Sequence, residues 1–265
     1  MNISVVIPVF NEEENVGELY DRLISVLGNE PGTEFIFVDD GSSDATFDRL
    51  REICQQDARV RIIRFRRNFG QTAALSAGID HARGEIIIPM DGDLQNDPTD
   101  IPRLLAKINE GYDVVSGWRK SRQDSFRRRL PSTIANRLIS WISGVHLHDY
   151  GCSLKAYRKD VLADVRLYGE MHRFVPIYAS WQGARVTEMA VTHHPRVHGK
   201  SKYGLERTMK VVLDMVVVKF LSSYSTKPIY VFGGFGIFAF VMSALAFALM
   251  LYYKLAGLKD FVQTP

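Results

Sequence analysis

One uncharged stretch near the end of the chain limits how the rest can fold. From Pro228 to Tyr253 the sequence runs for 26 residues without a charged side chain, between Lys227 and Lys254. At ~1.5 Å per residue, a helix of this length exceeds the ~30 Å hydrocarbon thickness of a bilayer. A buried core helix is the alternative, but such helices rarely run so long without a polar face. We therefore expect a transmembrane helix over residues 228–253.

The charges on either side of this stretch predict its orientation. Basic residues concentrate upstream, at Lys200, Lys202, Arg207, Lys210, Lys219 and Lys227, and only Lys254 and Lys259 follow it. By the positive-inside rule, the preceding domain is expected on the cytoplasmic side. The layout is then a domain over 1–205, a juxtamembrane segment over 206–227, the span over 228–253 and a tail over 254–265. The juxtamembrane segment is either an interfacial helix or a core helix, and we expect the tail to lead into a second span.

Cysteine usage agrees with a reducing compartment for the large domain. Cys54 and Cys152 are the two cysteines of the 265 residues, and neither stands in a CxxC or a zinc-binding pattern. The chain carries 33 Lys and Arg against 30 Asp and Glu, an ordinary balance for a globular protein.

The pattern of the first 120 residues predicts an α/β fold. Short β-branched runs cover 3–9, 34–38, 60–65, 85–90 and 112–116. A helical period follows the first run, from Val16 to Leu27, with Asn11 as its expected cap. Alternating strands and helices indicate a doubly wound, largely parallel, Rossmann-like sheet. Ligands of such sheets bind beyond the carboxyl ends of the strands.

Carboxylates stand where these strands end. Asp39 and Asp40 follow the second run, and Asp91 and Asp93 follow the fourth. The sequence has neither a GxGxxG after the first strand nor a Walker A motif, so the usual phosphate cradles are missing. Each acidic pair alone could be a surface turn. Together they favour a Mg²⁺ or Mn²⁺ ion between the carboxylates and a nucleotide diphosphate.

The sequence resembles the inverting nucleotide-sugar glycosyltransferases of family 2, which have the GT-A fold. More narrowly, it resembles dolichol-phosphate mannose synthases and bacterial undecaprenyl-phosphate sugar transferases. The matching stretches are VVIPVFNEEENV (5–16), FVDDGSSDAT (37–46), RNFGQTAALSAGID (67–80), MDGDLQNDP (90–98), DVVSGWR (113–119), DYGCSLKAYR (149–158) and RVHGKSKYG (196–204).

The resemblance implies roles for particular residues. The base and ribose of a UDP or GDP sugar would be held by Pro8, Phe10, Glu12, Val38 and Asp40. The metal and diphosphate would lie among Asp91, Gly92, Asp93 and Gln95, with further phosphate charge neutralised by Arg119, Arg196 and Lys202. Phe10 replaces a tyrosine common in the family, and Gly92 replaces a frequent alanine, a change expected to matter little.

A basic segment supplies the expected acceptor site. Residues 119–137 carry seven Lys or Arg side chains against the single Asp124, a net charge of +6. A nucleic-acid patch is the alternative, but base-stacking aromatic residues are sparse here. Beside a membrane anchor, a lipid phosphate is the better match. In the family, an arginine four residues before a serine binds the acceptor phosphate, and Arg128 with Ser132 has that spacing.

These features together predict sugar transfer to a polyprenyl phosphate at the inner membrane, for modification of the cell envelope or a glycan. Asp91, Asp93, Arg119 and Arg128 are the expected catalytic residues. The expected partners are the nucleotide sugar, the lipid phosphate and the bilayer, with no nucleic acid; a homo-oligomer stays open. Two alternatives remain, a processive polysaccharide synthase and a catalytically silent nucleotide-binding module at the membrane. The first is disfavoured because the sequence lacks a QxxRW signature.

Overall fold

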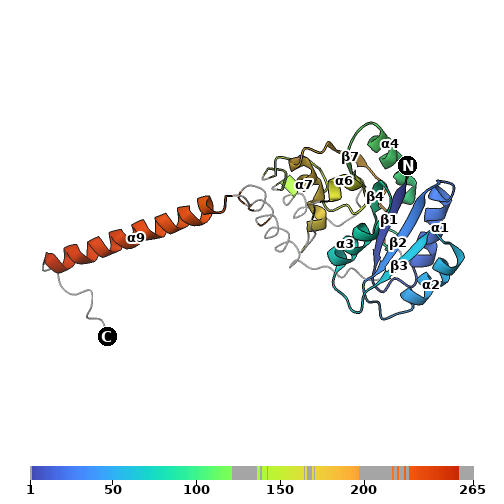
Figure 1. The fold of residues 1–265 in the computed structure, drawn as a ribbon, viewed down its shortest axis with the longest axis horizontal. Coiled ribbons are helices and arrows are strands. Elements are labelled where there is room, and N and C mark those ends of the chain that lie inside the picture. The colour runs from blue at the N-terminus through green and yellow to red at the C-terminus, as the bar shows by residue number, and fades with distance from the viewer. Residues whose placement is uncertain are drawn as a thin grey trace. The chain divides into compact units, whose positions relative to one another are not determined.

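Runs of β-branched and aromatic residues form a seven-stranded sheet of order β3-β2-β1-β4-β6-β5-β7 in the computed structural model (Figure 1). The model describes residues 2–120, 136–137, 139–141, 143–163, 165, 169, 171–196, 217, 220, 224 and 227–256. The strands are β1 (Ile3–Val9), β2 (Thr33–Asp39), β3 (Val60–Arg64), β4 (Ile86–Pro89), β5 (Val114–Trp118), β6 (Lys155–Arg158) and β7 (Val186–Ala190). This confirms the expected α/β class and the five runs predicted from the sequence.

The sheet is parallel except at one strand. β1 pairs in parallel with β2 and β4, β2 with β3, and β5 with β7. β6 runs antiparallel to both of its neighbours, β4 and β5. The amino end of β6 therefore lies at the same edge as the carboxyl ends of β4 and β5. In the parallel half, Val9 stands opposite Asp39 and Asp39 opposite Arg64, which brings the loops after these strands together.

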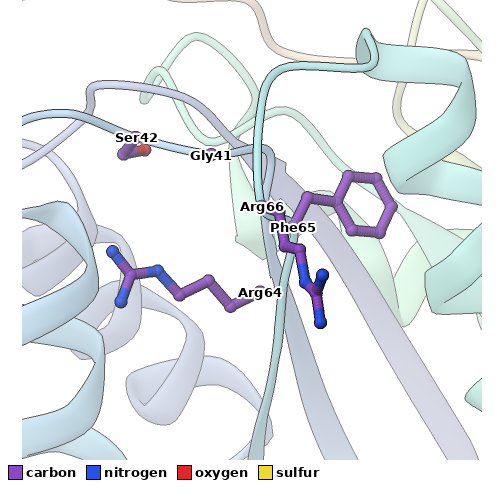
Figure 2. Close-up of a pocket in the computed structure, with 5 residues that line it drawn as sticks. All are labelled: Gly41, Ser42, Arg64, Phe65 and Arg66. Atoms are coloured by element: carbon purple, nitrogen blue, oxygen red, sulfur yellow. The ribbon is translucent and has the colours of Figure 1, made fainter.

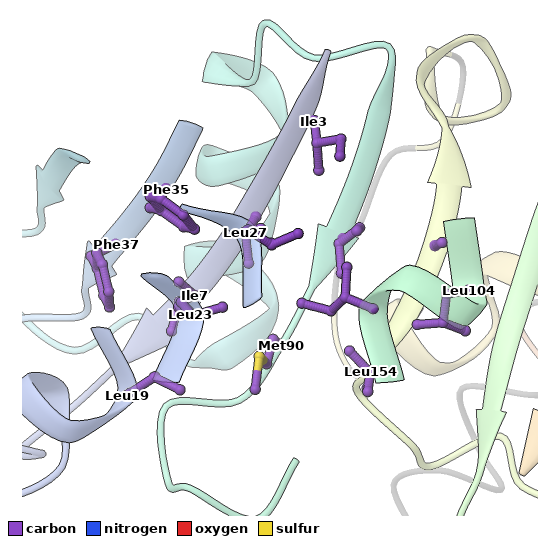
Figure 3. Close-up of a cluster of buried hydrophobic side chains, with 14 of the residues drawn as sticks. Ile3, Ile7, Leu19, Leu23, Leu27, Phe35, Phe37, Met90, Leu104 and Leu154 are labelled. Atoms are coloured by element: carbon purple, nitrogen blue, oxygen red, sulfur yellow. The ribbon is translucent and has the colours of Figure 1, made fainter. Parts of the chain in front are cut away.

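Two layers of helices cover the sheet because alternate strand residues point to opposite faces. One apolar cluster joins β1 and its neighbours to α1 (Val16–Leu27), α2 (Thr46–Gln56) and α4 (Ile101–Asn109) (Figure 3). The other joins the sheet to α3 (Gln71–His81), α6 (Lys159–Leu162) and α7 (Val175–Trp181). Two short 3₁₀ turns, η1 (Pro98–Asp100) and η2 (Met171–Arg173), complete the order. Loops lie at the carboxyl edge of the sheet.

The expected cap of the first helix is wrong. α1 begins at Val16, and its preceding residue is Asn15. Asn11 lies farther upstream with a left-handed φ of 53°, and its side-chain oxygen accepts a hydrogen bond from the backbone of Ser43 at 2.9 Å. Asparagine tolerates this conformation better than most residues. Asn11 therefore shapes the loop between β1 and α1 instead of starting the helix.

The chain consists of two compact units, Met1–Val216 and Val217–Pro265. The second unit contains α9 (Ile229–Leu255), a 27-residue helix with a mean hydropathy of 2.3 over its most apolar part and none of that part buried. By length and composition α9 is a candidate membrane span, starting one residue later and ending two residues later than the sequence predicted. The predicted juxtamembrane helix falls largely outside the described residues.

Candidate active site

Hydrogen bonds join the two loops that follow β1 and β2. The backbone N–H of Asn11 donates to Ser42 Oγ at 2.9 Å, and that of Glu12 donates to Thr46 Oγ1 at 2.8 Å. The Asp39 carboxylate accepts from the backbone N–H of Ser42, three residues on, at 2.9 Å, which shapes the loop after β2. The bonds from Asn11 and Glu12 then fix the two loops against each other.

Asp40 holds the start of α3. Its two carboxylate oxygens accept the backbone N–H groups of Phe69, at 2.7 Å, and Gly70, at 2.9 Å. Asp40 is buried, and burial raises the pKa of its carboxyl group. Gly41 beside it has a φ of +73°, and a Cβ there would lie 2.5 Å from the Arg67 backbone. Asp40 and Gly41 together bring the 67–70 loop onto the end of β2.

A cavity of about 340 Å³ opens next to this contact. Figure 2 shows its lining, with Gly41 and Ser42 after β2 and with Arg64, Phe65 and Arg66 at the end of β3. Arg64 and Phe65 point in opposite directions (Figure 2). The guanidinium of Arg64 stacks on the ring of Phe47, 4.0 Å from its centroid. The cavity therefore lies at the β2 and β3 end of the site, and none of its lining residues is a carboxylate.

The predicted metal residues lie on the loop after β4. Asp91 accepts hydrogen bonds from Gln71 and Ser153, each at 2.7 Å. Asp93 pairs with Arg196, with Nη2 and Oδ2 at 2.5 Å, and accepts the backbone N–H of Gln95 at 3.2 Å. Burial, followed by the negative charge of Asp91, raises the pKa of Asp93 to about 6. The buried Asp93 therefore feels the negative charge of the half-buried Asp91, which favours a nearby positive charge.

The backbone of this loop is tightly constrained. Leu94 has a left-handed φ of 61°, which costs free energy in a non-glycine residue, and its fully buried side chain belongs to the main apolar cluster. A Cβ at Gly92 would lie 2.7 Å from Val9 Cγ1. Alanine at position 92 would therefore need the Val9 side chain to move.

The chemistry of these residues fits a divalent cation. Within the described ranges no group of three or more His, Cys, Asp or Glu side chains comes together. Mg²⁺ and Mn²⁺ do not require one, since one or two carboxylates plus substrate phosphates and water complete such sites. Asp91 and Asp93 would be the two carboxylates of such a site. The side-chain amide of Gln95, predicted as a third ligand, lies 3.4 Å from the carbonyl oxygen of His194 and donates to it.

Arg119 is held in place by Asp149. Arg119 Nε and Nη2 donate to the two carboxylate oxygens of Asp149 at 2.7 and 2.9 Å. The two side chains are only 14% and 9% exposed. Burial alone would lower the pKa of Arg119, but the hydrogen bonds and charge of Asp149 outweigh it, so this pKa is raised. The negative charge of Asp91 contributes in the same direction, which connects this pair electrostatically with the metal residues.

Hydrogen bonds hold the segment after β7 against the loop after β4, which carries Asp91 and Asp93. His194 donates its backbone N–H to Gln95 at 2.8 Å, and its imidazole Nε2 lies 2.9 Å from Asp97. Thr192 donates its backbone N–H to the carboxylate of Asp100 at 2.6 Å. These contacts place Arg196 beside Asp93.

Most residues predicted to bind the nucleotide sugar lie at the carboxyl edge of the sheet. Pro8 stands opposite Val38 in the β1 and β2 pairing, and the Val38 side chain lies fully inside the second apolar cluster. Phe10 and Glu12 lie in the loop after β1. Arg128, Ser132 and Lys202 lie outside the described residues. Gln71, Asp149 and Ser153 lie in the stretches that carry the family resemblance, but their spacing along the chain predicts no role for them.

The matched family decides what kind of protein this is. The model of glycosyl transferase family 2 matches residues 4–166, which contain β1, β2 and the loop after β4 with Asp91 and Asp93. The chain belongs to glycosyl transferase family 2. This glycosyltransferase is 48% identical over 258 residues to a dodecaprenyl-phosphate galacturonate synthase of Rhizobium johnstonii, covering 95% of the chain and 75% of the relative. It is 40% identical over 250 residues to an undecaprenyl-phosphate 4-deoxy-4-formamido-L-arabinose transferase of Edwardsiella ictaluri, covering 93% and 74%.

Solved structures confirm the GT-A type of fold. A mannosyltransferase of Pyrobaculum calidifontis, in complex with GDP-mannose and Mn²⁺, superposes with a TM-score of 0.60 at 17% identity. That alignment covers 84% of this glycosyltransferase and 64% of the solved chain. TarS of Staphylococcus aureus, in complex with UDP-GlcNAc, gives 0.59 at 20% identity and covers 83% and 67%. At these identities the likeness concerns the fold.

Proposed function

We propose that this glycosyltransferase moves a sugar from a nucleotide diphosphate to a polyprenyl phosphate at the cytoplasmic face of the inner membrane. The observation that carries the proposal is the pairing of two kinds of charge at one sheet edge. Asp91 and Asp93 form an acidic pair, and the buried Arg119 lies close enough to respond to the charge of Asp91. The names of the two relatives, both with polyprenyl-phosphate substrates, support the choice of acceptor.

The reaction needs little acid or base chemistry from the protein. The second pKa of a phosphate monoester is ~6, so the acceptor is largely a dianion at neutral pH. One of its oxygens bonds to the anomeric carbon, while the bond from that carbon to the diphosphate oxygen breaks and its electron pair leaves with the nucleotide. A single displacement inverts the anomeric centre. The chain must therefore hold two negative phosphates in line and reduce their repulsion.

The described residues divide that work. Mg²⁺ or Mn²⁺, when bound at Asp91 and Asp93, neutralises charge on the leaving diphosphate. Arg196, which pairs with Asp93, and Lys202 are both proposed to bind the same diphosphate. Arg119 keeps its orientation through Asp149 and is proposed to contact phosphate oxygens. We assign Arg128 and Ser132 to the acceptor phosphate, with Gln95 as a further metal ligand.

We infer that the nucleoside lies along the loops after β1 and β2. Pro8, Phe10, Glu12, Val38 and Asp40 are the residues assigned to it, and the cavity begins at Gly41, directly after Asp40. The α9 candidate span would keep the domain near its lipid substrate. We further propose the arrangement of a 1–205 catalytic domain, a 206–227 juxtamembrane segment and a span close to 228–253.

Transfer assays with purified protein test this function. The full chain in detergent should move radiolabel from a nucleotide sugar into a chloroform-soluble product only when undecaprenyl phosphate and Mn²⁺ are present. The donors to compare are UDP-galacturonic acid, UDP-glucose, UDP-N-acetylglucosamine and GDP-mannose. A water-soluble polymer formed without lipid phosphate would favour a polysaccharide synthase. Nucleotide binding without turnover of any donor would favour the silent module.

A further inference from the structure

The hydrogen bonds of Asp91 set it apart from Asp93. Gln71 Nε2 donates to Asp91 Oδ1, and Ser153 Oγ donates to Asp91 Oδ2, both at 2.7 Å. Among the residues that the structure describes, each Asp91 oxygen therefore accepts from one neutral side chain, whereas Asp93 faces the charged Arg196. A carboxylate oxygen has two lone pairs, so each Asp91 oxygen keeps one for another partner. Asp91 is thus held in a fixed plane by two neutral donors.

Asn96 determines the direction of the Ser153 hydroxyl. Its side-chain Nδ2 donates to Ser153 Oγ at 2.8 Å, and Asn96 is only 2% exposed. An amide nitrogen can only donate, and a serine hydroxyl carries a single proton. Since Ser153 accepts from Asn96, that proton is directed to Asp91. The two hydrogen bonds therefore point the same way, because Asn96 donates to Ser153 and Ser153 donates to Asp91.

Gln71 is equally well anchored. It is the first residue of α3, and the residue before it, Gly70, donates its backbone N–H to Asp40. The next residue, Thr72, donates its hydroxyl to the carbonyl oxygen of Gly169 at 2.6 Å. Gln71 is therefore fixed on both sides. The side chain reaching Asp91 starts from a part of the backbone that other segments hold.

We propose that Gln71 and Ser153 are positioning residues that fix Asp91 for the divalent cation, with Asn96 setting the direction of the serine hydroxyl. This inference rests on the proposed metal site. Groups that orient metal-binding side chains matter because a freely rotating ligand must be ordered when the metal binds. Loss of such a contact typically weakens metal affinity about 10- to 100-fold.

Mn²⁺ binding measures this directly, without turnover. The full chain in detergent is titrated with Mn²⁺ alone, and the free ion is followed by electron paramagnetic resonance. Ser153→Ala and Gln71→Met each remove one donor and should raise the Kd for Mn²⁺ about 10-fold. Ser153→Thr keeps the hydroxyl and should stay within about threefold of the parent.

Ser116→Ala is the matched control. Ser116 is fully buried on β5, and in the part of the chain that the structure describes its hydroxyl finds no hydrogen-bond partner. Its removal should leave the Kd for Mn²⁺ unchanged. Circular dichroism should show that every variant is folded before titration.

Each outcome separates this inference from the proposed function. A Kd for Mn²⁺ that neither Ser153→Ala nor Gln71→Met changes, in folded protein, overturns the positioning role. A parent protein that binds no Mn²⁺ overturns the metal site together with its positioning residues. A parent protein that binds Mn²⁺ and loses affinity in the variants, but transfers no sugar to undecaprenyl phosphate, overturns the proposed acceptor and leaves the positioning role intact.

Discussion

Replacing Asp149 by asparagine tests how much the buried ion pair with Arg119 stabilises the protein. Asp149 accepts two hydrogen bonds from the guanidinium and one, at 3.0 Å, from the backbone N–H of Gly151. Asparagine keeps one acceptor oxygen, but its amide nitrogen would turn a second donor toward Arg119. Arg119 would then be a buried cation that keeps only one of the two side-chain oxygens to which it donates at position 149.

The size of the effect follows from the burial of the pair. Breaking a buried pair by changing one partner costs about 3–5 kcal/mol. Since asparagine keeps one oxygen, we expect the lower end, about 3 kcal/mol in the free energy of unfolding. For a domain of about 200 residues, each kcal/mol lowers the melting temperature by about 2–4 °C, so Asp149→Asn should lower it by about 6–12 °C. Transfer activity should fall at least tenfold because Arg119 loses its fixed direction.

The exposed pair of Lys107 and Glu110 provides the control. Its N–O distance is also 2.7 Å, but its side chains are 39% and 52% exposed. Exposed pairs contribute little to stability, so Glu110→Gln should leave the melting temperature nearly unchanged. Thermal unfolding followed by circular dichroism gives both values. If Asp149→Asn melts as Glu110→Gln does and keeps full activity, the argument from burial is refuted.

Three further predictions concern the metal, the acceptor and pH. EDTA should abolish transfer, and Asp93→Ala should reduce kcat/KM at least 100-fold because the leaving diphosphate loses its neutralising cation. Arg128→Ala should raise the KM for undecaprenyl phosphate in steady-state assays while calorimetry shows unchanged nucleotide-sugar affinity. The hydrogen bonds of Arg59 lower the pKa of Asp57 from 3.8 to about 2, so its stabilisation is complete above about pH 4 and lost as pH falls through 2. Asp57→Asn should therefore cost about 1 kcal/mol at pH 7, a value reduced because Arg59 is 36% exposed, and almost nothing near pH 2 in urea unfolding.

Each of these has a contradicting result. Full transfer in excess EDTA removes the metal from the reaction. A parallel loss of nucleotide-sugar affinity in Arg128→Ala moves this arginine to the donor site. A stability difference for Asp57→Asn that is the same at pH 2 and pH 7 would show that the ion pair is not its source.

Local pattern predicted the strands that carry a run of β-branched residues, including β3 with Arg61 and Arg64, and could not predict the others. β1 to β5 are short β-branched runs, and Val16 to Leu27 repeats with a helical period. β6 is only four residues long and contains Lys155, which is fully buried and donates to the carbonyl oxygen of Tyr150 at 3.2 Å. Burial lowers the pKa of Lys155 to about 8. A buried lysine interrupts the apolar run by which strands are recognised, and its partner becomes visible only in the fold.

The same distinction applies to the site. Asp91 and Asp93 could be predicted because they directly follow a strand. Gln71 and Ser153 could not, because they lie 20 and 62 residues from Asp91 in the sequence. Asp149 is likewise 30 residues from Arg119. Spacing along the chain shows which residue types occur at strand ends, but the partners that hold them come from other elements.

The reversed direction of β6 lets one part of this enzyme change independently. The chain leaves the sheet at Trp118 and re-enters it at Lys155. Because β6 is antiparallel to β5, both points lie at the same edge of the sheet. Residues 119–154 therefore form an excursion whose ends are joined by the pair of Arg119 and Asp149. The stretch between Lys120 and His148 can therefore change in length without shifting the register of any strand. Arg119, Asp149 and Ser153 at its two ends have to be kept, because Arg119 pairs with Asp149 and Ser153 donates to Asp91.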